Sequence, residues 1–223
     1  MQQYQMDFIE FLVRSEVLTF GDFVTKSGRE TPYFINTGRY RMGNQLAQLG
    51  RFYAEAILRC FGPDVDNLYG PAYKGIPLAV TTAIAMGSEH KLDVSVTYNR
   101  KEIKDHGEKG VLIGHQYNGS EQVIIIEDVI TAGTSVRETL ELLKKQGNPQ
   151  VKGVIVSVDR MERGQGKLSA IQEMKEQFSL PVYSIVTVRD IIAHLYNHPL
   201  DGQTYINDDM KARIEGYLNQ YGI

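Results

Sequence analysis

Apolar positions along this chain repeat with two different periods, and each period predicts one type of element. Between Leu46 and Phe61 they recur at i, i+3 and i+4 and stop at Gly62 and Pro63, which predicts a helix with a defined end. Five short runs rich in branched aliphatic residues predict strands at or near 68–69, 94–98, 123–126, 151–158 and 182–186. Helical spacing returns further along and predicts helices over 168–178, 188–195 and 210–218. This alternation predicts an α/β fold with a mainly parallel sheet.

The beginning of the chain follows a different pattern. Phe8, Phe11 and Leu12 share one face of an amphipathic opening helix. From Phe23 to Ile35, two β-prone runs, FVT and YFI, flank the turn-rich SGRETP and predict an antiparallel hairpin. We therefore expect a small lobe ahead of the main sheet. No repeat or linker divides the sequence, so we expect residues 1–223 to form one domain.

The stretch VIIIEDVITAGTS, residues 123–135, combines a strand, an acidic pair and a small-residue turn. Its continuous apolar run fits a strand buried on both faces, and Glu127 and Asp128 stand where that strand should end. Helical spacing resumes behind TAGTS and stops at Gly147, so the small residues occupy a strand-to-helix turn. Such a turn attracts a phosphate through backbone N–H groups and the helix dipole. The acids repel a phosphate and need sugar hydroxyls or a divalent cation instead.

Each half of that stretch has an ordinary structural explanation. The acids alone are typical of a solvated strand end, and Thr and Ser are favoured helix caps. Their combination at the carboxyl end of a buried strand, where open α/β sheets bind ligands, favours a site for a phosphorylated sugar.

Composition narrows the class of protein. A net charge of −3, from 24 basic and 27 acidic residues, leaves no overall electrostatic footprint for nucleic acid. Cys60 is the only cysteine, lies in a helical pattern and is expected to be a buried, inert thiol in a reducing compartment. The N-terminus lacks a signal pattern, and the longest weakly polar stretch, 76–86, is too short to span a bilayer. We expect a soluble, cytoplasmic protein with neither a nucleic-acid nor a membrane partner.

The segment NRKEIKDHGEK, residues 99–109, is dominated by charge. It carries Arg100, Lys101, Lys104 and Lys109 beside three acids and His106, with only Ile103 to bury. A solvated loop is the usual interpretation of a charge run. Its basic groups are also suited to close over a departing polyanion and exclude water from the reacting sugar.

These motifs resemble a known family. VIIIEDVITAGTS resembles the phosphoribosyl pyrophosphate (PRPP) binding motif of type I phosphoribosyltransferases, and RKEIKDHGEKG resembles the catalytic loop of the orotate phosphoribosyltransferases. FVTKSGRETPYFINTG, GPAYKGIPLA and the Asp159–Arg160 pair resemble the same family, so the matches touch most of the chain.

The resemblance implies a type I phosphoribosyltransferase fold, with a hood over residues 1–40 and an α/β core over 41–223. It implies transfer of ribose 5-phosphate from PRPP to orotate, giving orotidine 5′-monophosphate and pyrophosphate in pyrimidine biosynthesis. Mg²⁺ would be required and held mainly through PRPP, with no metal ligands from the protein. The resemblance also implies a homodimer in which the Arg100 to His106 loop is shared across the interface.

The family's site residues carry over position by position. The PRPP-binding positions are Lys26, Tyr73, Lys74, Arg100, Lys101, Lys104, His106, Glu127, Asp128, Val129, Ile130, Thr131, Ala132, Gly133, Thr134 and Ser135. Those implied to act in catalysis are Arg100, Lys101, Lys104, His106 and Asp128. Those implied to bind orotate are Phe34, Ile35, Thr131 and Arg160; an aromatic residue often replaces Ile35 in the family. Taken singly, Lys26 and Lys74 are typical of solvent-facing lysines, and Asp159–Arg160 of a surface ion pair.

Three alternatives remain at this level. A PRPP-sensing regulator would carry a DNA-binding helical module or a basic face, and the sequence indicates neither. A transferase for another base would share the PRPP motif but not RKEIKDHGEKG. His194 and His198 have the i, i+4 spacing of zinc ligands, but a surface pair is favoured because no third ligand stands nearby in the pattern.

Overall fold

A computed structural model describes residues 1–25, 28–101, 110–130, 133–164 and 168–223 of the chain. The helices are α1 (Gln3–Arg14), α2 (Gly43–Phe61), α3 (Gly75–His90), α4 (Thr134–Lys145), α5 (Ala170–Phe178), α6 (Val188–Leu195) and α7 (Asp208–Tyr221), with a 3₁₀ turn η1 (Thr37–Arg39). The strands are β1 (Leu18–Val24), β2 (Glu30–Ile35), β3 (Asn67–Tyr69), β4 (Ser95–Asn99), β5 (Leu112–Gly114), β6 (Gln122–Glu127), β7 (Gln150–Asp159) and β8 (Val182–Thr187).

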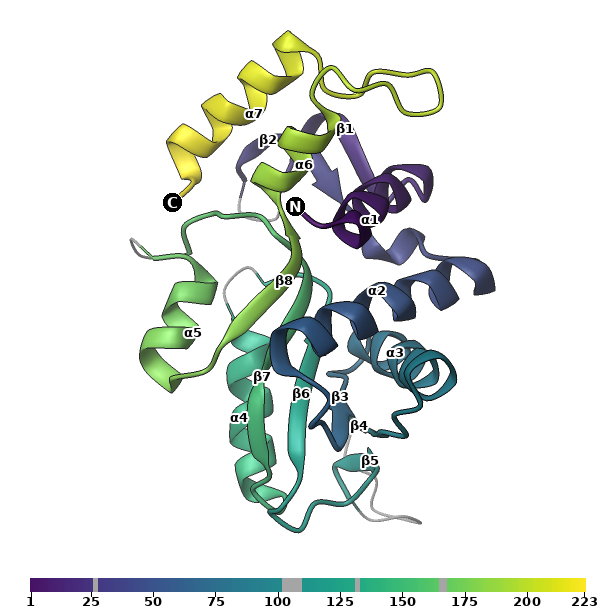
Figure 1. Ribbon diagram of the computed structural model, residues 1–223. Coiled ribbons are helices and arrows are strands. Elements are labelled where there is room, and N and C mark those ends of the chain that lie inside the picture. The colour runs from purple at the N-terminus through teal and green to yellow at the C-terminus, as the bar shows by residue number, and fades with distance from the viewer. Residues whose placement is uncertain (26–27, 102–109, 131–132, 165–167) are drawn as a thin grey trace.

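The main sheet has six strands in the order β5-β4-β3-β6-β7-β8 (Figure 1). Strand β5 is antiparallel to β4, and the other neighbours are parallel, so the predicted fold class is confirmed. The chain adds β4 and β5 on one side of β3 and then returns to add β6 on the other. The direction of winding therefore reverses between β3 and β6, the place where open α/β sheets bind ligands.

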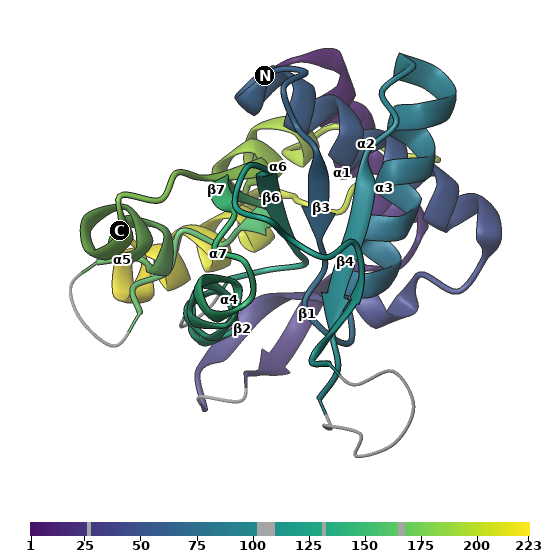
Figure 2. The same cartoon turned by 90° about the horizontal axis from the view of Figure 1, so that it is seen from below.

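Both faces of the sheet are covered, which explains the continuous apolar run in β6. Ile124 and Ile126 belong to a core cluster shared with α1, α2 and α3. Val123 and Ile125 belong to a second cluster, with Val136 of α4 and other residues of the opposite face. Figure 2 shows α4 on one side of the strands and α2 and α3 on the other.

Helix α3 was not predicted as a separate element, because its sequence is weakly polar all round and contains Pro77. The proline lies in the first helical turn, where no intrahelical N–H bond is lost. A Cβ on Gly50 of α2 would lie 2.3 Å from the carbonyl oxygen of Thr81. The two helices thus approach so closely that only glycine fits at this crossing.

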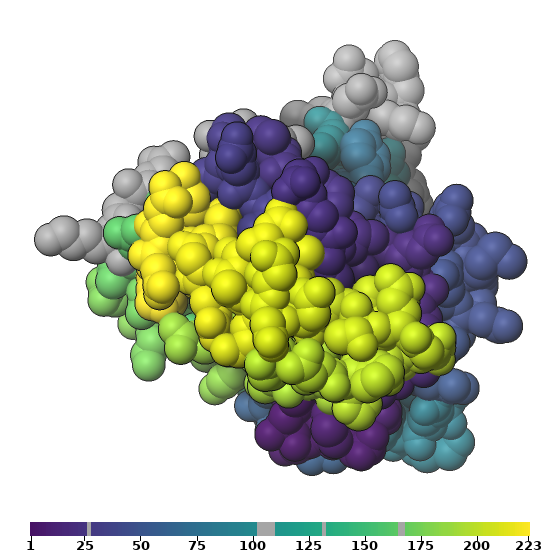
Figure 3. All heavy atoms as spheres, turned by 90° about the horizontal axis from the view of Figure 1, so that it is seen from above, coloured from purple at the N-terminus to yellow at the C-terminus, as the bar shows by residue number. Residues whose placement is uncertain are grey.

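Strands β1 and β2 form a separate antiparallel pair, which confirms the predicted hairpin. The hairpin begins at Leu18, earlier in the chain than the predicted Phe23. Helix α7 packs on this pair, with Tyr217 edge-on to Tyr33 at a ring-centroid distance of 6.0 Å. Seen from above, the C-terminal segments lie directly beside the N-terminal ones (Figure 3). The layer above the sheet is therefore built from both ends of the chain.

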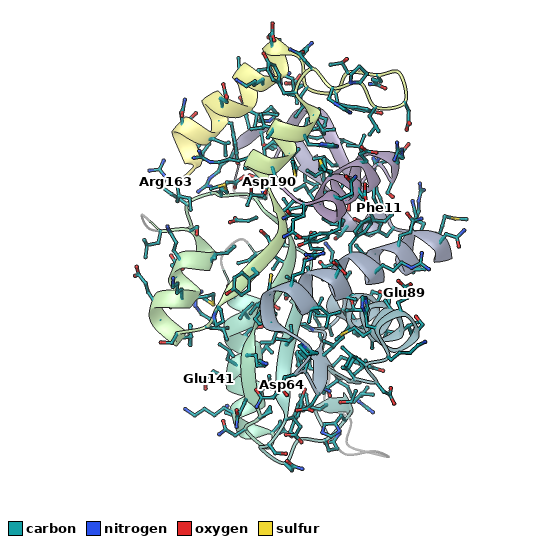
Figure 4. The ribbon with its side chains drawn as sticks, viewed as in Figure 1. Phe11, Asp64, Glu89, Glu141, Arg163 and Asp190 are labelled. Atoms are coloured by element: carbon teal, nitrogen blue, oxygen red, sulfur yellow. The ribbon has the colours of Figure 1, made fainter. Side chains whose placement is uncertain are left out.

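The opening helix joins this layer to the core through aromatic contacts. Phe11, labelled in Figure 4, stacks on Tyr40 at a centroid distance of 5.4 Å and meets Phe52 of α2 at the same distance. Cys60 is half-buried and not fully buried as expected, and its partial burial raises the pKa of the thiol.

Within the described ranges, no helix combines the length and the hydropathy that a bilayer span requires.

Candidate functional site

Apart from those of the N-terminal hairpin, the predicted site residues lie at or just after the carboxyl ends of four parallel strands. Strands β3, β4, β6 and β7 end at Tyr69, Asn99, Glu127 and Asp159. Because parallel strands end at one edge of a sheet, the segments that follow them meet there.

Glu127 is buried, with 8% of its surface exposed. Burial raises the pKa of its carboxyl group to about 7; a hydrogen bond from Ser135 opposes this rise, and the charge of Asp128 adds to it. The Tyr53 hydroxyl donates to the Glu127 carbonyl at 2.7 Å and holds the end of the strand in place. Glu127 is thus poised between its two protonation states near neutral pH.

Asp128 accepts hydrogen bonds on both carboxylate oxygens. Its Oδ2 accepts from Lys74 Nζ at 2.9 Å and from Thr37 Oγ1 at 2.7 Å, and its Oδ1 accepts from the Val129 amide at 2.8 Å. The Ser157 amide donates to the Asp128 carbonyl at 3.0 Å. The orientation of this carboxylate is therefore set by donors from three separate segments.

The small-residue turn leads into α4 as predicted. Gly133 has φ +67°, a conformation that favours glycine, and the Met174 Cε would lie 2.9 Å from a Cβ at this position. The first amides of α4, beginning at Thr134, have no carbonyl acceptor within their own helix. A pocket of about 120 Å³ opens against this turn, lined by Glu127, Val129, Ile130, Gly133, Thr134, Ser135 and Val136. A phosphate would meet both the amides and the positive end of the helix here. Thr131 and Ala132 lie outside the described residues.

The turn after β3 brings a lysine to the same edge. A Cβ on Gly70 would lie 2.2 Å from the carbonyl oxygen of Gly75, so the loop closes on itself too tightly for another residue. This closure places Lys74 against Asp128, although 64% of the lysine side chain stays exposed. Lys74 therefore lies at the same edge of the sheet as the acidic pair and forms an ion pair with Asp128.

The start of the charged segment lies beside this turn. Lys101 Nζ lies 4.8 Å from the ring centroid of Tyr73, and the ring is 66% exposed. Arg100 directly follows β4. Lys104 and His106 lie outside the described residues, as does Lys26 of the hairpin.

Only 11% of the Arg160 side chain is exposed, so the alternative of a surface ion pair is wrong. Its guanidinium covers the ring of Tyr33 at 4.5 Å, and its Nε donates to Glu162 at 2.7 Å. Its Nη2 lies 2.6 Å from the same Glu162 oxygen without an aligned hydrogen bond. Asp159 instead accepts from the Met161 amide, so the partner of Arg160 is Glu162.

The two hairpin residues predicted to contact a base are half-buried. Phe34 stacks on Phe23 at a centroid distance of 5.5 Å, while Ile35 packs against the main core.

His194 and His198 stack at a ring-centroid distance of 5.3 Å, and His194 contacts Glu10 at 3.2 Å. No group of three metal-binding side chains occurs within the described ranges.

Four further residues lie at this edge and were not predicted from the sequence: Thr37, Tyr53, Ser157 and Glu162. Thr37 lies within the stretch FVTKSGRETPYFINTG, and Glu162 lies two residues beyond Arg160. Their closeness to these motifs in the sequence could have identified both as site residues. Nothing in the local pattern distinguishes Tyr53 or Ser157 from core residues.

Comparison with known proteins gave consistent matches. Residues 37–182 match the model of the phosphoribosyl transferase domain. A protein named orotate phosphoribosyltransferase from Clostridium beijerinckii is 54% identical over 222 residues, covering 100% of this chain and 99% of that protein. One of the same name from Cronobacter sakazakii is 48% identical, with 100% of both chains covered. The crystal structure of the Francisella tularensis orotate phosphoribosyltransferase is 34% identical, with a TM-score of 0.84, and covers 97% of this chain and 100% of that one.

Proposed function

This chain belongs to the orotate phosphoribosyltransferase family, and we propose that the edge site described above carries out the family's reaction. The fold is that of the type I phosphoribosyltransferases, as the resemblance implied. The reaction transfers ribose 5-phosphate from PRPP to orotate and releases pyrophosphate. Family membership also supports a cytoplasmic location and a place in pyrimidine biosynthesis. The observation that carries the proposal is the convergence of the acidic pair, the α4 N-terminus and Lys74 at one sheet edge.

The ribose 5-phosphate half of PRPP fits the β6–α4 segment. The 5′-phosphate would occupy the pocket at the turn spanning residues 129–135 and accept from its backbone amides. The ribose hydroxyls would donate to the carboxylates of Glu127 and Asp128. These contacts fix the sugar while its anomeric carbon reacts.

The pyrophosphate half fits the basic groups on the other side of Asp128. Lys74 already lies at 2.9 Å from that carboxylate, and it would move to the pyrophosphate together with Tyr73. Arg100 and Lys101 begin the adjacent charged segment, and we propose that Lys104, His106 and Lys26 complete the set. Positive charge at these positions would stabilise the negative charge that develops on the leaving group.

Orotate carries a carboxylate, and we propose that Arg160 binds it. The guanidinium is buried, stacked on Tyr33 and oriented by Glu162, so it is held ready for a bidentate contact. Phe34, Ile35 and Thr131 would provide the remaining contacts to the base. Arg160→Lys keeps the charge but loses the planar fork, and we expect it to raise the KM for orotate about tenfold or more.

The residues at this edge fit a magnesium ion that is held mainly by its substrate. Glu127 and Asp128 supply hard oxygen atoms, but both carboxylates already accept hydrogen bonds from neighbouring groups. A few protein ligands together with phosphate oxygens suit Mg²⁺. When bound with PRPP, the ion would neutralise charge on the pyrophosphate.

One assay tests the reaction itself. The protein is incubated with PRPP, Mg²⁺ and, separately, orotate, uracil or a purine, and pyrophosphate release is measured. We expect release with orotate alone. Pyrophosphate release only with a purine would show that the acceptor is a purine and not orotate. The absence of release with every base would favour a PRPP-sensing regulator.

We also propose that two copies of the chain form a homodimer through α3. Pro77, Val80 and Ile84 lie at i, i+3 and i+7 on the exposed face of this helix, and Ile84 is 64% exposed. Ile84→Asp places a charge in the proposed interface and is expected to shift the protein to monomer in sedimentation equilibrium. A variant that remains fully dimeric would rule out this face.

Sharing of the Arg100 to His106 loop between subunits can be tested by complementation. Lys101→Gln damages the loop, and Asp128→Asn damages the core site. If the loop acts in the partner's site, mixed dimers contain one site built only from wild-type residues and recover activity. If the loop acts in its own subunit, as the Lys101 contact with Tyr73 within one chain would favour, mixing restores nothing.

A further inference from the structure

Thr37 connects the hairpin layer to the acidic pair. It begins the η1 turn that follows β2, and its Oγ1 lies 2.7 Å from Asp128 Oδ2 and 3.2 Å from Lys74 Nζ. Lys74 Nζ is itself 2.9 Å from the same Asp128 oxygen. Three side chains from three separate segments therefore contact one another.

The chemistry of the three groups fixes the direction of each hydrogen bond. A lysine ammonium only donates, and an ionised carboxylate only accepts. The Thr37 hydroxyl must therefore accept from Lys74 and donate to Asp128. The proton of this hydroxyl is directed at one oxygen of the carboxylate.

The two partners of Thr37 differ in freedom. The Asp128 side chain is 11% exposed, whereas the Lys74 side chain is 64% exposed. Asn36 accepts a hydrogen bond from the Gly38 amide at 3.1 Å and holds the η1 turn in shape. Lys74 can leave the group, while Thr37 and Asp128 are held in place.

We infer that Thr37 is a positioning residue for PRPP, acting through Asp128; this inference rests on the proposed function. When Lys74 moves to the pyrophosphate, the Thr37 hydroxyl still holds Asp128 Oδ2, and the carboxylate keeps its orientation toward the ribose hydroxyls. Thr37 and Asp128 also line a pocket of about 260 Å³ whose other walls include Leu46, Leu49 and Leu78. Apolar walls reduce screening by water, which strengthens the hydrogen bond to the carboxylate.

The test is Thr37→Val, which removes the hydroxyl and nearly preserves the shape. We expect the KM for PRPP to rise about tenfold, within the range for a hydrogen bond to a charged group. The KM for orotate should stay within about twofold of wild type, because Thr37 acts through Asp128 on the ribose of PRPP and not on the base. Thr37→Ser restores the hydroxyl and should return the KM for PRPP to near the wild-type value.

Two controls separate positioning from a general structural effect. Thr81→Val is the same chemical change at a hydroxyl that donates at 2.7 Å to Pro77 within α3, and it should leave the KM for PRPP unchanged. In an Asp128→Ala background, Thr37→Val should have no further effect on PRPP binding measured by calorimetry, because the side chain through which Thr37 acts is gone.

The outcomes are distinct. An unchanged KM for PRPP in Thr37→Val, or an equal loss in the Asp128→Ala background, overturns the inference. A raised KM for orotate with a lowered Tm assigns Thr37 to the placement of the hairpin layer instead. If the wild type releases no pyrophosphate with any base, the proposed function fails, and calorimetry with PRPP still decides the role of Thr37.

Discussion

Glu127→Gln tests whether burial of Glu127 costs stability. The glutamate is 8% exposed, and burial raises the pKa of its carboxyl group from 4.5 to about 7. Glutamine is nearly isosteric, and its amide oxygen can still accept from Ser135, but it carries no charge that burial could destabilise. We expect the variant to be more stable than wild type at neutral pH and less able to bind PRPP.

The size and the sign of this stability difference follow from the linkage between proton binding and folding. An acid whose pKa is raised in the folded state destabilises that state only when it ionises. The effect is absent below about pH 4.5, grows as the pH rises and is complete above about pH 7. Each tenfold change in proton affinity corresponds to about 1.4 kcal/mol, so the loss of folding stability on ionisation of Glu127 reaches about 3 kcal/mol. For a chain of this length, that corresponds to roughly 6 to 12 °C in Tm.

The measurement is urea unfolding of both proteins from pH 4 to pH 8 at one protein concentration. We expect equal stability within about 0.5 kcal/mol at pH 4 and an advantage for Glu127→Gln that grows to about 3 kcal/mol at pH 8. Glu141→Gln, at an exposed position on α4, serves as the matched control and should show no such trend. A difference that stays constant with pH, or a wild type that is more stable at pH 8, would refute the reasoning.

Three further predictions concern the same edge of the sheet. PRPP affinity, measured by calorimetry, should rise between pH 6 and pH 8 more steeply in wild type than in Glu127→Gln, because ribose hydroxyls bind the ionised carboxylate; parallel curves would contradict this. Lys74→Gln should raise the KM for PRPP about tenfold or more, which is the size expected for the loss of a contact with a charged group. The Tm should change little, since 64% of the lysine side chain is exposed. An unchanged KM for PRPP would remove Lys74 from the site. Gly133→Ala should lower the free energy of unfolding by about 1 to 2 kcal/mol, because Gly133 has a positive φ. Gly216 lies at an exposed position in the middle of α7, and Gly216→Ala should raise the free energy of unfolding by about 0.5 to 1 kcal/mol. A Gly133→Ala variant that is more stable than wild type would contradict the prediction of backbone strain at this position.

Elements with a strong local period could be predicted because their side chains repeat on one face. Helix α2 and strand β6 lie where the apolar pattern predicted them. Strand β5 could not be predicted, since its three residues have no period and pair with β4 only in the folded chain. Helix α3 lacks a distinct polar face, so its pattern did not separate helix from other buried segments.

The chemistry of the site could also be predicted from the sequence only in part. The acidic pair and the small-residue turn were predicted because their residue types suit sugar and phosphate binding, whereas Lys74 was assigned through the family resemblance. The partner of Arg160 was not predicted, because an adjacent Asp159 is closer in sequence than the Glu162 that the fold brings to it. The roles assigned to the site residues remain predictions, and Lys26, Lys104, His106, Thr131 and Ala132 also lie outside the described residues.

The sequence by itself determined which chemical groups stand at the ends of the strands, since strand period and residue type are local properties. Only the tertiary structure decided how those groups behave. The pKa of Glu127 depends on burial by the surrounding chain, and Thr37 meets Asp128 across 91 residues of sequence. Burial and long-range contact are properties of packing, because water is excluded and distant segments meet only when the whole core has formed.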